Sequence, residues 1–394
     1  MKRDFMFTSE SVTEGHPDKL CDQIADAVLD RYLRQDPMSQ VITECAVSNG
    51  ILFIASRFAS QATVDIPEVA RQVIQQVGYD REEFNATDCT VMTSLTEMPI
   101  ALVRDEREMS EAELERIPAR NMANVFGFAC NQTPNLMPLP VWLAHKLARR
   151  LASARLQRHL AYLAPDGKTQ VGVEYRDGRP YRIHSLTLVA SQWGDRAVSP
   201  ERLRDDLYQL VIEPAFQDAP LQPDRSTAIF VNPDGPLING GPVTHSGLTG
   251  RKNAIDTYGE YSRQSESALS GKDPSRIDRV GAYAARYAAK NVVAAGLADV
   301  CEVQLTYSIG QARPVSIQID SHGTGNVSDE VIAQRIQAVF DFRPAGIIRE
   351  FNLRELPTLY RGGFYHKLSA YGHVGRMDIG LPWERTDKTA ELKG

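Results

Sequence analysis

The alternation of apolar and polar positions along the chain predicts three β-hairpins, each followed by a helix. Asn49-Gly50 and Asp177-Gly178 are typical of tight hairpin turns and mark the first two units. The first unit is predicted to contain strands over 40–48, 51–60 and 89–95 and a helix over 67–77. The second is predicted to contain strands over 169–175, 182–191 and 227–231 and a helix over 200–212. The third is predicted to contain strands over 302–309 and 315–320 and a helix over 329–340.

Three similar hairpin–helix units indicate an α+β fold of three layers rather than a doubly wound parallel sheet. We expect an N-terminal α+β domain over 1–103, a central one over 118–236 and a C-terminal one over 237–394. A further long helix is predicted over 140–160, with its arginines facing solvent. Its expected buried stripe consists of Trp142, Leu143, Leu147, Leu151 and Leu156.

Composition argues against nucleic-acid and membrane partners and indicates the compartment in which the protein is expected. The chain has 394 residues, a net charge of −6 and no long basic run, which argues against a nucleic-acid partner. No apolar run is long enough to span a bilayer, so no membrane partner is expected. The five cysteines are scattered and odd in number, which fits a reducing, cytoplasmic location.

The segment 15–19 offers the most specific chemistry. Pro17 suits the first position of a helix, and the N–H groups of a helix start attract anions. His16 and Asp18 flank that proline, and Asp18 can hold a cation beside the anion. An ordinary helix start is the alternative interpretation.

Two later segments offer similar parts. A glycine-rich stretch, 240–250, leads to Arg251 and Lys252, which suit phosphate, although the spacing is not that of a Walker loop. In the segment 270–278, Asp273 is predicted to cap a helix that begins at Pro274 and runs to about residue 296. Surface turns and a simple helix cap are the alternatives.

Together these segments resemble the S-adenosylmethionine synthetase (methionine adenosyltransferase) family over nearly the whole chain. The matching motifs are Thr8-Ser9-Glu10-Ser11-Val12, Gly15-His16-Pro17-Asp18-Lys19, Pro165-Asp166-Gly167-Lys168, Gly240-Gly241-Pro242, Gly247-Leu248-Thr249-Gly250-Arg251-Lys252 and Ser270-Gly271-Lys272-Asp273-Pro274-Ser275. Ala282 to Tyr287 and Ala370 to Arg376 also match. The resemblance implies three pseudo-symmetric domains and a homodimer, often a dimer of dimers, with active sites between subunits.

The resemblance also implies a reaction. The thioether sulfur of methionine attacks C5′ of ATP and displaces triphosphate, which is then hydrolysed to diphosphate and phosphate. Alignment and charge stabilisation supply the rate, because the sulfur has no proton to lose. The implied catalytic residues are His16, Lys168, Arg251 and Lys272, and the residues implied to bind ATP and phosphate also include Lys252 and Asp166. Asp18 and Asp278 are implied Mg²⁺ ligands, and Glu44 matches a ligand of a monovalent cation such as K⁺.

The chain departs from the family pattern mostly on the acceptor side. Two carboxylates that bind the methionine ammonium in the family correspond to Arg57 and His245. The other departures are Asn121 for an aspartate, Leu237 for an aromatic residue near adenine and Arg276 for a lysine. Replacing attraction of the ammonium by repulsion costs at least roughly 2 kcal/mol even with strong screening. The acceptor is therefore methionine or a variant thioether, such as an acidic or deaminated one.

Arg57 also has a local interpretation. If the Asn49-Gly50 turn has two residues, Glu44 lies opposite Ala55, with Arg57 as its diagonal neighbour. An ion pair between Glu44 and Arg57 could then replace K⁺.

Two other functions remain open from sequence. One is hydrolysis of ATP or tripolyphosphate, with water as the acceptor. The other is a non-catalytic regulatory subunit of a true synthetase, against which the retained phosphate-binding residues argue.

Overall fold

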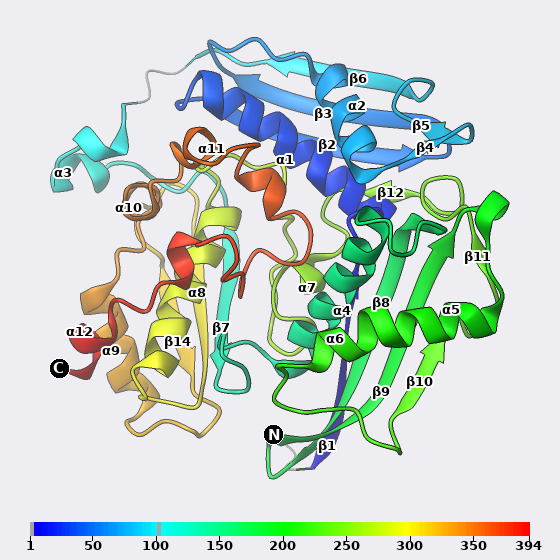
Figure 1. The fold of residues 1–394 in the computed structure, drawn as a ribbon. Coiled ribbons are helices and arrows are strands. Elements are labelled where there is room, and N and C mark those ends of the chain that lie inside the picture. Colours follow the sequence, from blue (N-terminus) through cyan, green and yellow to red (C-terminus); the bar gives the residue numbers. More distant parts are fainter. Residues whose placement is uncertain (1–3, 101–103) are drawn as a thin grey trace.

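The computed structural model describes residues 4–100 and 104–394, so the expected domain boundary at residue 103 lies outside the described residues. Three mixed layers of helix and sheet are arranged around the middle of the molecule (Figure 1). Each layer has one long helix packed on the inner side of its sheet. These helices are α1 (Pro17–Gln35), α4 (Leu139–Leu156) and α8 (Ile277–Ala294). The α+β class expected from the three repeated units is confirmed.

The first sheet has the order β1-β8-β9-β10, with β11 also paired to β9. Its strands are β1 (Phe5–Val12), β8 (Leu163–Arg176), β9 (Arg179–Gln192), β10 (Ala228–Val231) and β11 (Leu237–Ile238). The second sheet has the order β12-β2-β3-β6. Its strands are β2 (Gln40–Ser48), β3 (Ile51–Ala59), β6 (Thr90–Glu97) and β12 (Gly247–Leu248).

The third sheet has the order β14-β13-β7, and a small ribbon joins β4 to β5. These strands are β7 (Ala123–Cys130), β13 (Val300–Tyr307), β14 (Ser316–Asp320), β4 (Asp80–Arg81) and β5 (Phe84–Asn85). The remaining α-helices are α2 (Ile66–Val77), α3 (Glu111–Leu114), α5 (Pro200–Leu207), α6 (Glu213–Phe216), α7 (Asn253–Asp256), α9 (Asp329–Val339), α10 (Pro344–Phe351), α11 (Leu356–Leu359) and α12 (Thr389–Lys393). No described helix meets the length and hydropathy needed to cross a membrane.

The sheets exchange strands between distant parts of the chain. β1 pairs with β8, β12 pairs with β2, and β7 pairs with β13. Because these partners are far apart in sequence, neither β1 nor β7 was predicted from local pattern. The exchange brings the glycine-rich segment against the start of α1, and it positions the site described below.

Two helix predictions need correction. The helix expected over 200–212 is present and continues to Phe216, but a π-helical turn over Tyr208–Ile212 lies within it, between α5 and α6. Pro214 follows that turn and has no N–H to continue an α-helical ladder, so the wider turn joins the two helices. Leu156, expected in the buried stripe of α4, is the last residue of the helix and is exposed.

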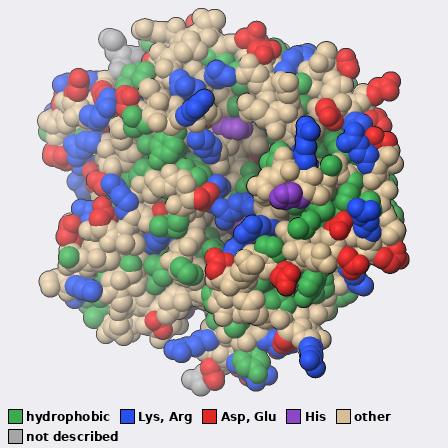
Figure 2. All heavy atoms as spheres, viewed as in Figure 1, with side chains coloured by type: hydrophobic (Ala, Val, Ile, Leu, Met, Phe, Trp, Pro, Cys, Tyr) green, Lys and Arg blue, Asp and Glu red, His purple; other side chains and the backbone are tan. Residues whose placement is uncertain are grey.

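One face of the molecule carries a basic hollow. Lys and Arg side chains gather near the centre of the view in Figure 2. A cleft of about 410 Å³ beside α4 is lined by Lys146, Arg149 and Arg150 together with Asp378. Arg149 lies 3.4 Å from the Asp378 carboxylate, so the α4 arginines do not simply face solvent as predicted.

Candidate active site

The start of α1 forms the first part of the candidate site. Pro17 stands in the first turn, as predicted, and His16 is the N-cap residue. The His16 Nδ1 accepts a hydrogen bond from the Asp18 N–H at 3.2 Å. Pro17 has no N–H and the Asp18 N–H is already bonded, so it is the positive end of the helix dipole that favours an anion at this end of α1.

The glycine-rich segment closes over Asp18. The Leu248 N–H donates to Asp18 Oδ1 at 3.0 Å, while Lys252 Nζ and Arg251 Nη1 lie 3.5 and 3.8 Å from the same carboxylate. A Cβ at Gly247 would come within 2.2 Å of the Pro17 carbonyl oxygen, so only glycine allows this approach. The predicted grouping of Asp18, Arg251 and Lys252 is thus present in the structure.

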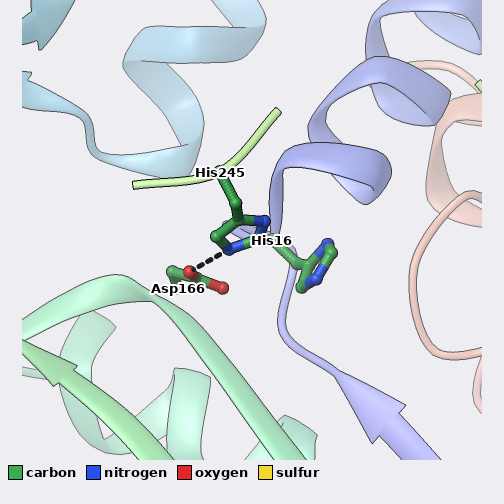
Figure 3. A group of neighbouring side chains, drawn as sticks. All are labelled: His16, Asp166 and His245. Carbon is green, nitrogen blue, oxygen red and sulfur yellow. Dashed lines mark hydrogen bonds and ion pairs between the residues drawn. The ribbon is translucent and has the colours of Figure 1, made fainter. Parts of the chain in front are cut away.

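Asp166 and His245 meet beside His16 (Figure 3). His245 Nε2 lies 3.0 Å from Asp166 Oδ2, which also accepts the Gly241 N–H at 3.0 Å. The ring centroids of His16 and His245 are 4.8 Å apart. Sequence reasoning placed His245 in an acceptor pocket and did not foresee its contact with Asp166, which is 79 residues away.

His16 is held as a neutral imidazole. Burial, followed by charge repulsion from His245, Lys252 and Lys168, lowers its pKa from 6.5 to about 2. Lys168 is exposed on β8, paired with Val12 of β1. We call His16, Asp18, Asp166, Lys168, His245, Arg251 and Lys252 the first half-site.

Lys272 and Asp278 lie in a separate group that we call the second half-site, together with Asn121 and Glu44. The Asn121 Nδ2 donates to both carboxylate oxygens of Asp278 at 3.1 Å, and Lys272 Nζ lies 3.8 Å from Asp278. Burial lowers the pKa of Lys272, although the charges of Asp278 and Glu44 oppose that change. Arg276 lies beside this group, 3.8 Å from the Asp273 carboxylate.

The expected start of α8 is wrong. The helix begins at Ile277, not at Pro274, and Asp273 does not cap it. Asp273 is fully buried and its Oδ2 accepts the N–H of Val41 on β2 at 2.8 Å. The segment before α8 is therefore held as an extension of the second sheet.

The two half-sites lie at opposite ends of β2 in one chain. Lys272 bridges to Ile42, whereas Gly247 pairs with Val47. Five residues of strand correspond to about 17 Å. A single chain therefore does not bring the predicted residues into one cluster.

The predicted ion pair between Glu44 and Arg57 is not formed. Glu44 does lie opposite Ala55, and Arg57 lies opposite Ile42, as the two-residue turn requires. Both side chains are exposed, and no ion pair joins them in the described part of the chain. An ion pair between two exposed diagonal neighbours gains little free energy in water, so nothing holds the two side chains together.

Leu237 is half-buried on β11, paired with Ser191 at the edge of the first sheet.

The oxygen donors fit the expected Mg²⁺. Mg²⁺ is usually held by one or two carboxylates together with phosphate oxygens and water. Asp18 and Asp278 each present one such carboxylate, and their lysine and arginine neighbours stand 3.5 to 3.8 Å away, beyond close hydrogen-bond distance.

Comparisons with known proteins identify the family of the chain. Family models of the N-terminal, central and C-terminal domains of S-adenosylmethionine synthetase match residues 4–99, 116–237 and 239–385. The S-adenosylmethionine synthases of Trichormus variabilis and Gloeothece citriformis are each 49% identical, with 100% of this chain and 97% of the relative aligned. That of Microcystis aeruginosa is 48% identical, over 100% of this chain and 98% of the relative. The chain therefore belongs to the S-adenosylmethionine synthetase family.

Proposed function

We propose that this protein transfers the adenosyl group of ATP to the sulfur of a thioether, releasing triphosphate that is then hydrolysed to diphosphate and phosphate. The observation that carries the proposal is the cluster of His16, Asp18, Arg251 and Lys252 around the start of α1. That cluster presents the cationic side chains of Arg251 and Lys252 to one polyanion, at the positive end of the α1 dipole. The whole-chain relatedness to S-adenosylmethionine synthases favours transfer over hydrolysis alone or a regulatory role.

The residues have distinct roles in this proposal. Arg251, Lys252, Lys168 and Lys272 hold the triphosphate and stabilise the charge it gains on leaving. Neutral His16 is placed beside C5′ of ATP. Because its ring carries no charge, it does not hinder the approach of the thioether sulfur to that carbon. Asp166 binds the Gly241 N–H and so fixes the glycine-rich segment over the nucleotide.

Two cations are proposed to assist. Mg²⁺ on Asp18 and Asp278 would neutralise phosphate charge. Glu44 is the carboxylate proposed for a monovalent cation such as K⁺, since no described residue forms an ion pair with it and it lies near Lys272.

A second copy of the chain is proposed to complete each site, because Lys272 and Gly247 pair with positions of β2 that are about 17 Å apart in one chain. The outer face of the second sheet supports this proposal. Ile51, Phe53, Met92 and Leu248 lie on it, and each is more than 40% exposed. A face-to-face pairing of two such sheets is isologous and would cover this apolar surface. The first half-site of one chain would then meet the second half-site of its partner.

Mixing two inactive variants tests this arrangement. His16→Ala disables the first half-site and Lys272→Ala the second. In randomly mixed dimers half of the molecules are hybrids with one intact site, so activity should return to about a quarter of wild type. Each variant alone is the control, and no recovery on mixing after co-refolding would contradict a shared site.

We further propose that the acceptor is a thioether without a nearby ammonium group. His245 is engaged by Asp166, and Arg57 presents a cation that has no ion pair in the described ranges, on the face that a second copy would cover. Neither side chain attracts an ammonium, and Arg57 suits a carboxylate.

Mass spectrometry of products from ATP, Mg²⁺ and a panel of thioethers decides the acceptor. We expect adenosyl adducts of deaminated or acidic thioethers to form faster than S-adenosylmethionine. Preferred use of methionine would refute the altered acceptor and leave the transfer reaction intact. Phosphate release without any adduct would refute the transfer itself.

A further inference from the structure

We propose that His16, Asp166 and His245 form a binding site for a divalent transition-metal ion of the Zn²⁺ class, distinct from the Mg²⁺ position at Asp18. One ligand atom from each residue lies within 4.8 Å of the other two. Among residues 4–100 and 104–394, this is the one group of three His, Cys, Asp or Glu side chains so placed. Figure 3 shows the three side chains coming from the start of α1, the first sheet and the glycine-rich segment, with His245 in contact with Asp166 and His16 beside them.

Asp166 provides an observation that points to a ligand. Its side chain is 1% exposed, and its Oδ1 has no hydrogen-bond partner among the residues that the structure describes. Its Oδ2 already accepts from Gly241 and His245. A buried carboxylate oxygen without a partner is costly, and a bound cation would satisfy it.

His16 can ligate through Nε2. Its Nδ1 now accepts the Asp18 N–H at 3.2 Å, which is a long hydrogen bond. Ligation at Nε2 would put the proton on Nδ1, which would give up the bond from the Asp18 N–H and turn to donate to Asp18 Oδ2, now 3.8 Å away. A metal-bound imidazole commonly donates its other N–H to such a carboxylate, so Asp18 would orient the ring.

His245 can adjust to close the site. Its side chain is 33% exposed, whereas Asp166 and His16 are buried. Ligands of a tetrahedral Zn²⁺ stand about 3.3 Å apart, given Zn–N distances near 2.0–2.1 Å. The separations of up to 4.8 Å therefore need a shift that an exposed side chain can make.

The ligand set selects the metal. Two imidazoles and one carboxylate favour Zn²⁺, Co²⁺ or Fe²⁺ over Mg²⁺, which prefers oxygen ligands. Three protein ligands leave a coordination position open, as in catalytic zinc sites. Lys168 and Lys252 oppose a cation here, so we expect weaker binding than in a structural zinc site.

Co²⁺ absorption spectroscopy and Zn²⁺ calorimetry test the site on the full-length protein without ATP, in buffer containing Mg²⁺. We expect one Co²⁺ per chain with visible d–d bands, displaced by Zn²⁺ and not by Mg²⁺. His245→Ala should weaken Zn²⁺ binding at least tenfold, because a ligand is lost. His184→Ala is the matched control, since His184 pairs with Glu174 outside the site and should leave binding unchanged.

Two outcomes would overturn the proposal: no d–d bands in the wild-type protein, or Zn²⁺ binding unaltered in a folded His245→Ala variant. Asp166→Asn offers a second check, because an amide keeps the shape but is a poor ligand. Neither result depends on the acceptor or on turnover, so failure of the metal site and failure of the proposed transfer reaction are distinguishable.

Discussion

The segments before α1 and α8 look alike in sequence and fold differently. Each places a basic or imidazole side chain before a proline and a carboxylate just after the expected helix start. In the first, the helix begins at Pro17 and His16 caps it. In the second, the helix begins only at Ile277, after the chain has paired with β2. The same local signals thus gave a helix cap in one place and an extension of a sheet in the other.

Backbone pairing explains the difference. The Gly271 carbonyl accepts the Thr43 N–H at 2.8 Å, and the Asp273 N–H donates to the Val41 carbonyl at 3.0 Å. These bonds hold the segment in extended form, so the helix cannot begin there. Tertiary contact overrides a local capping signal when the capping side chain has a buried partner elsewhere.

The strongest test of this contrast is Gly271→Ala. Gly271 has φ +78°, and a Cβ there would lie 2.0 Å from the Thr43 carbonyl oxygen. Strain and a clash with backbone together should destabilise the protein by about 3 kcal/mol or more. Urea unfolding at fixed protein concentration measures the change.

Gly50→Ala is the matched control, because no atom of the described residues lies within 4 Å of a Cβ at that turn position. It should change the unfolding free energy by less than about 0.5 kcal/mol. Equal stability of both variants would show that the segment before α8 is not held against β2.

Asp273→Ala distinguishes between two roles of Asp273: acceptor of a buried backbone N–H, or cap of a helix. Losing the acceptor of the buried Val41 N–H should cost about 2–3 kcal/mol. A cap alone would cost about 1 kcal/mol, and Ser328→Ala, which removes the N-cap of α9, provides that reference. A cost for Asp273→Ala no larger than that of Ser328→Ala would contradict the structural role given to Asp273.

Local pattern was enough to predict the hairpins and α1, because each is specified by residues adjacent in sequence. The edge strands β1 and β7 were not predicted, since what stabilises them is pairing with β8 and β13 more than a hundred residues away. The residues of the site likewise fall into those that could be predicted from local sequence and those that could not. Motif spacing identified Asp18, Arg251 and Lys252, but no spacing rule could place His245 against Asp166 or separate Lys272 from His16 in one chain.

The first half-site should make stability depend on pH. The pKa of His16 is about 2 when folded and 6.5 in a model peptide, so the unfolded chain binds the additional proton. Stability from this residue is then present above pH 6.5 and is lost by about 1.4 kcal/mol per pH unit below it. His16→Asn keeps an N-cap acceptor and cannot titrate.

The difference in unfolding free energy between wild type and His16→Asn should therefore shift by about 1.4 kcal/mol between pH 7.5 and 5.5, in favour of the variant at low pH. Urea titrations at the two pH values measure it. A difference that does not change with pH would mean that His16 is not held neutral.

The smallest expected effect concerns Glu44 and Arg57 on the outer face of the second sheet. Both are exposed and unpaired within the described chain, so a double-mutant cycle with Glu44→Gln and Arg57→Gln should give a coupling below about 0.3 kcal/mol in the monomer. If a second copy covers this face, each side chain can meet a charge of the partner, and the coupling should grow in the dimer. Measuring the cycle below and above the dimerisation concentration thus tests whether this surface becomes part of a shared site. A large coupling at both concentrations would show that Glu44 and Arg57 do form an ion pair within one chain.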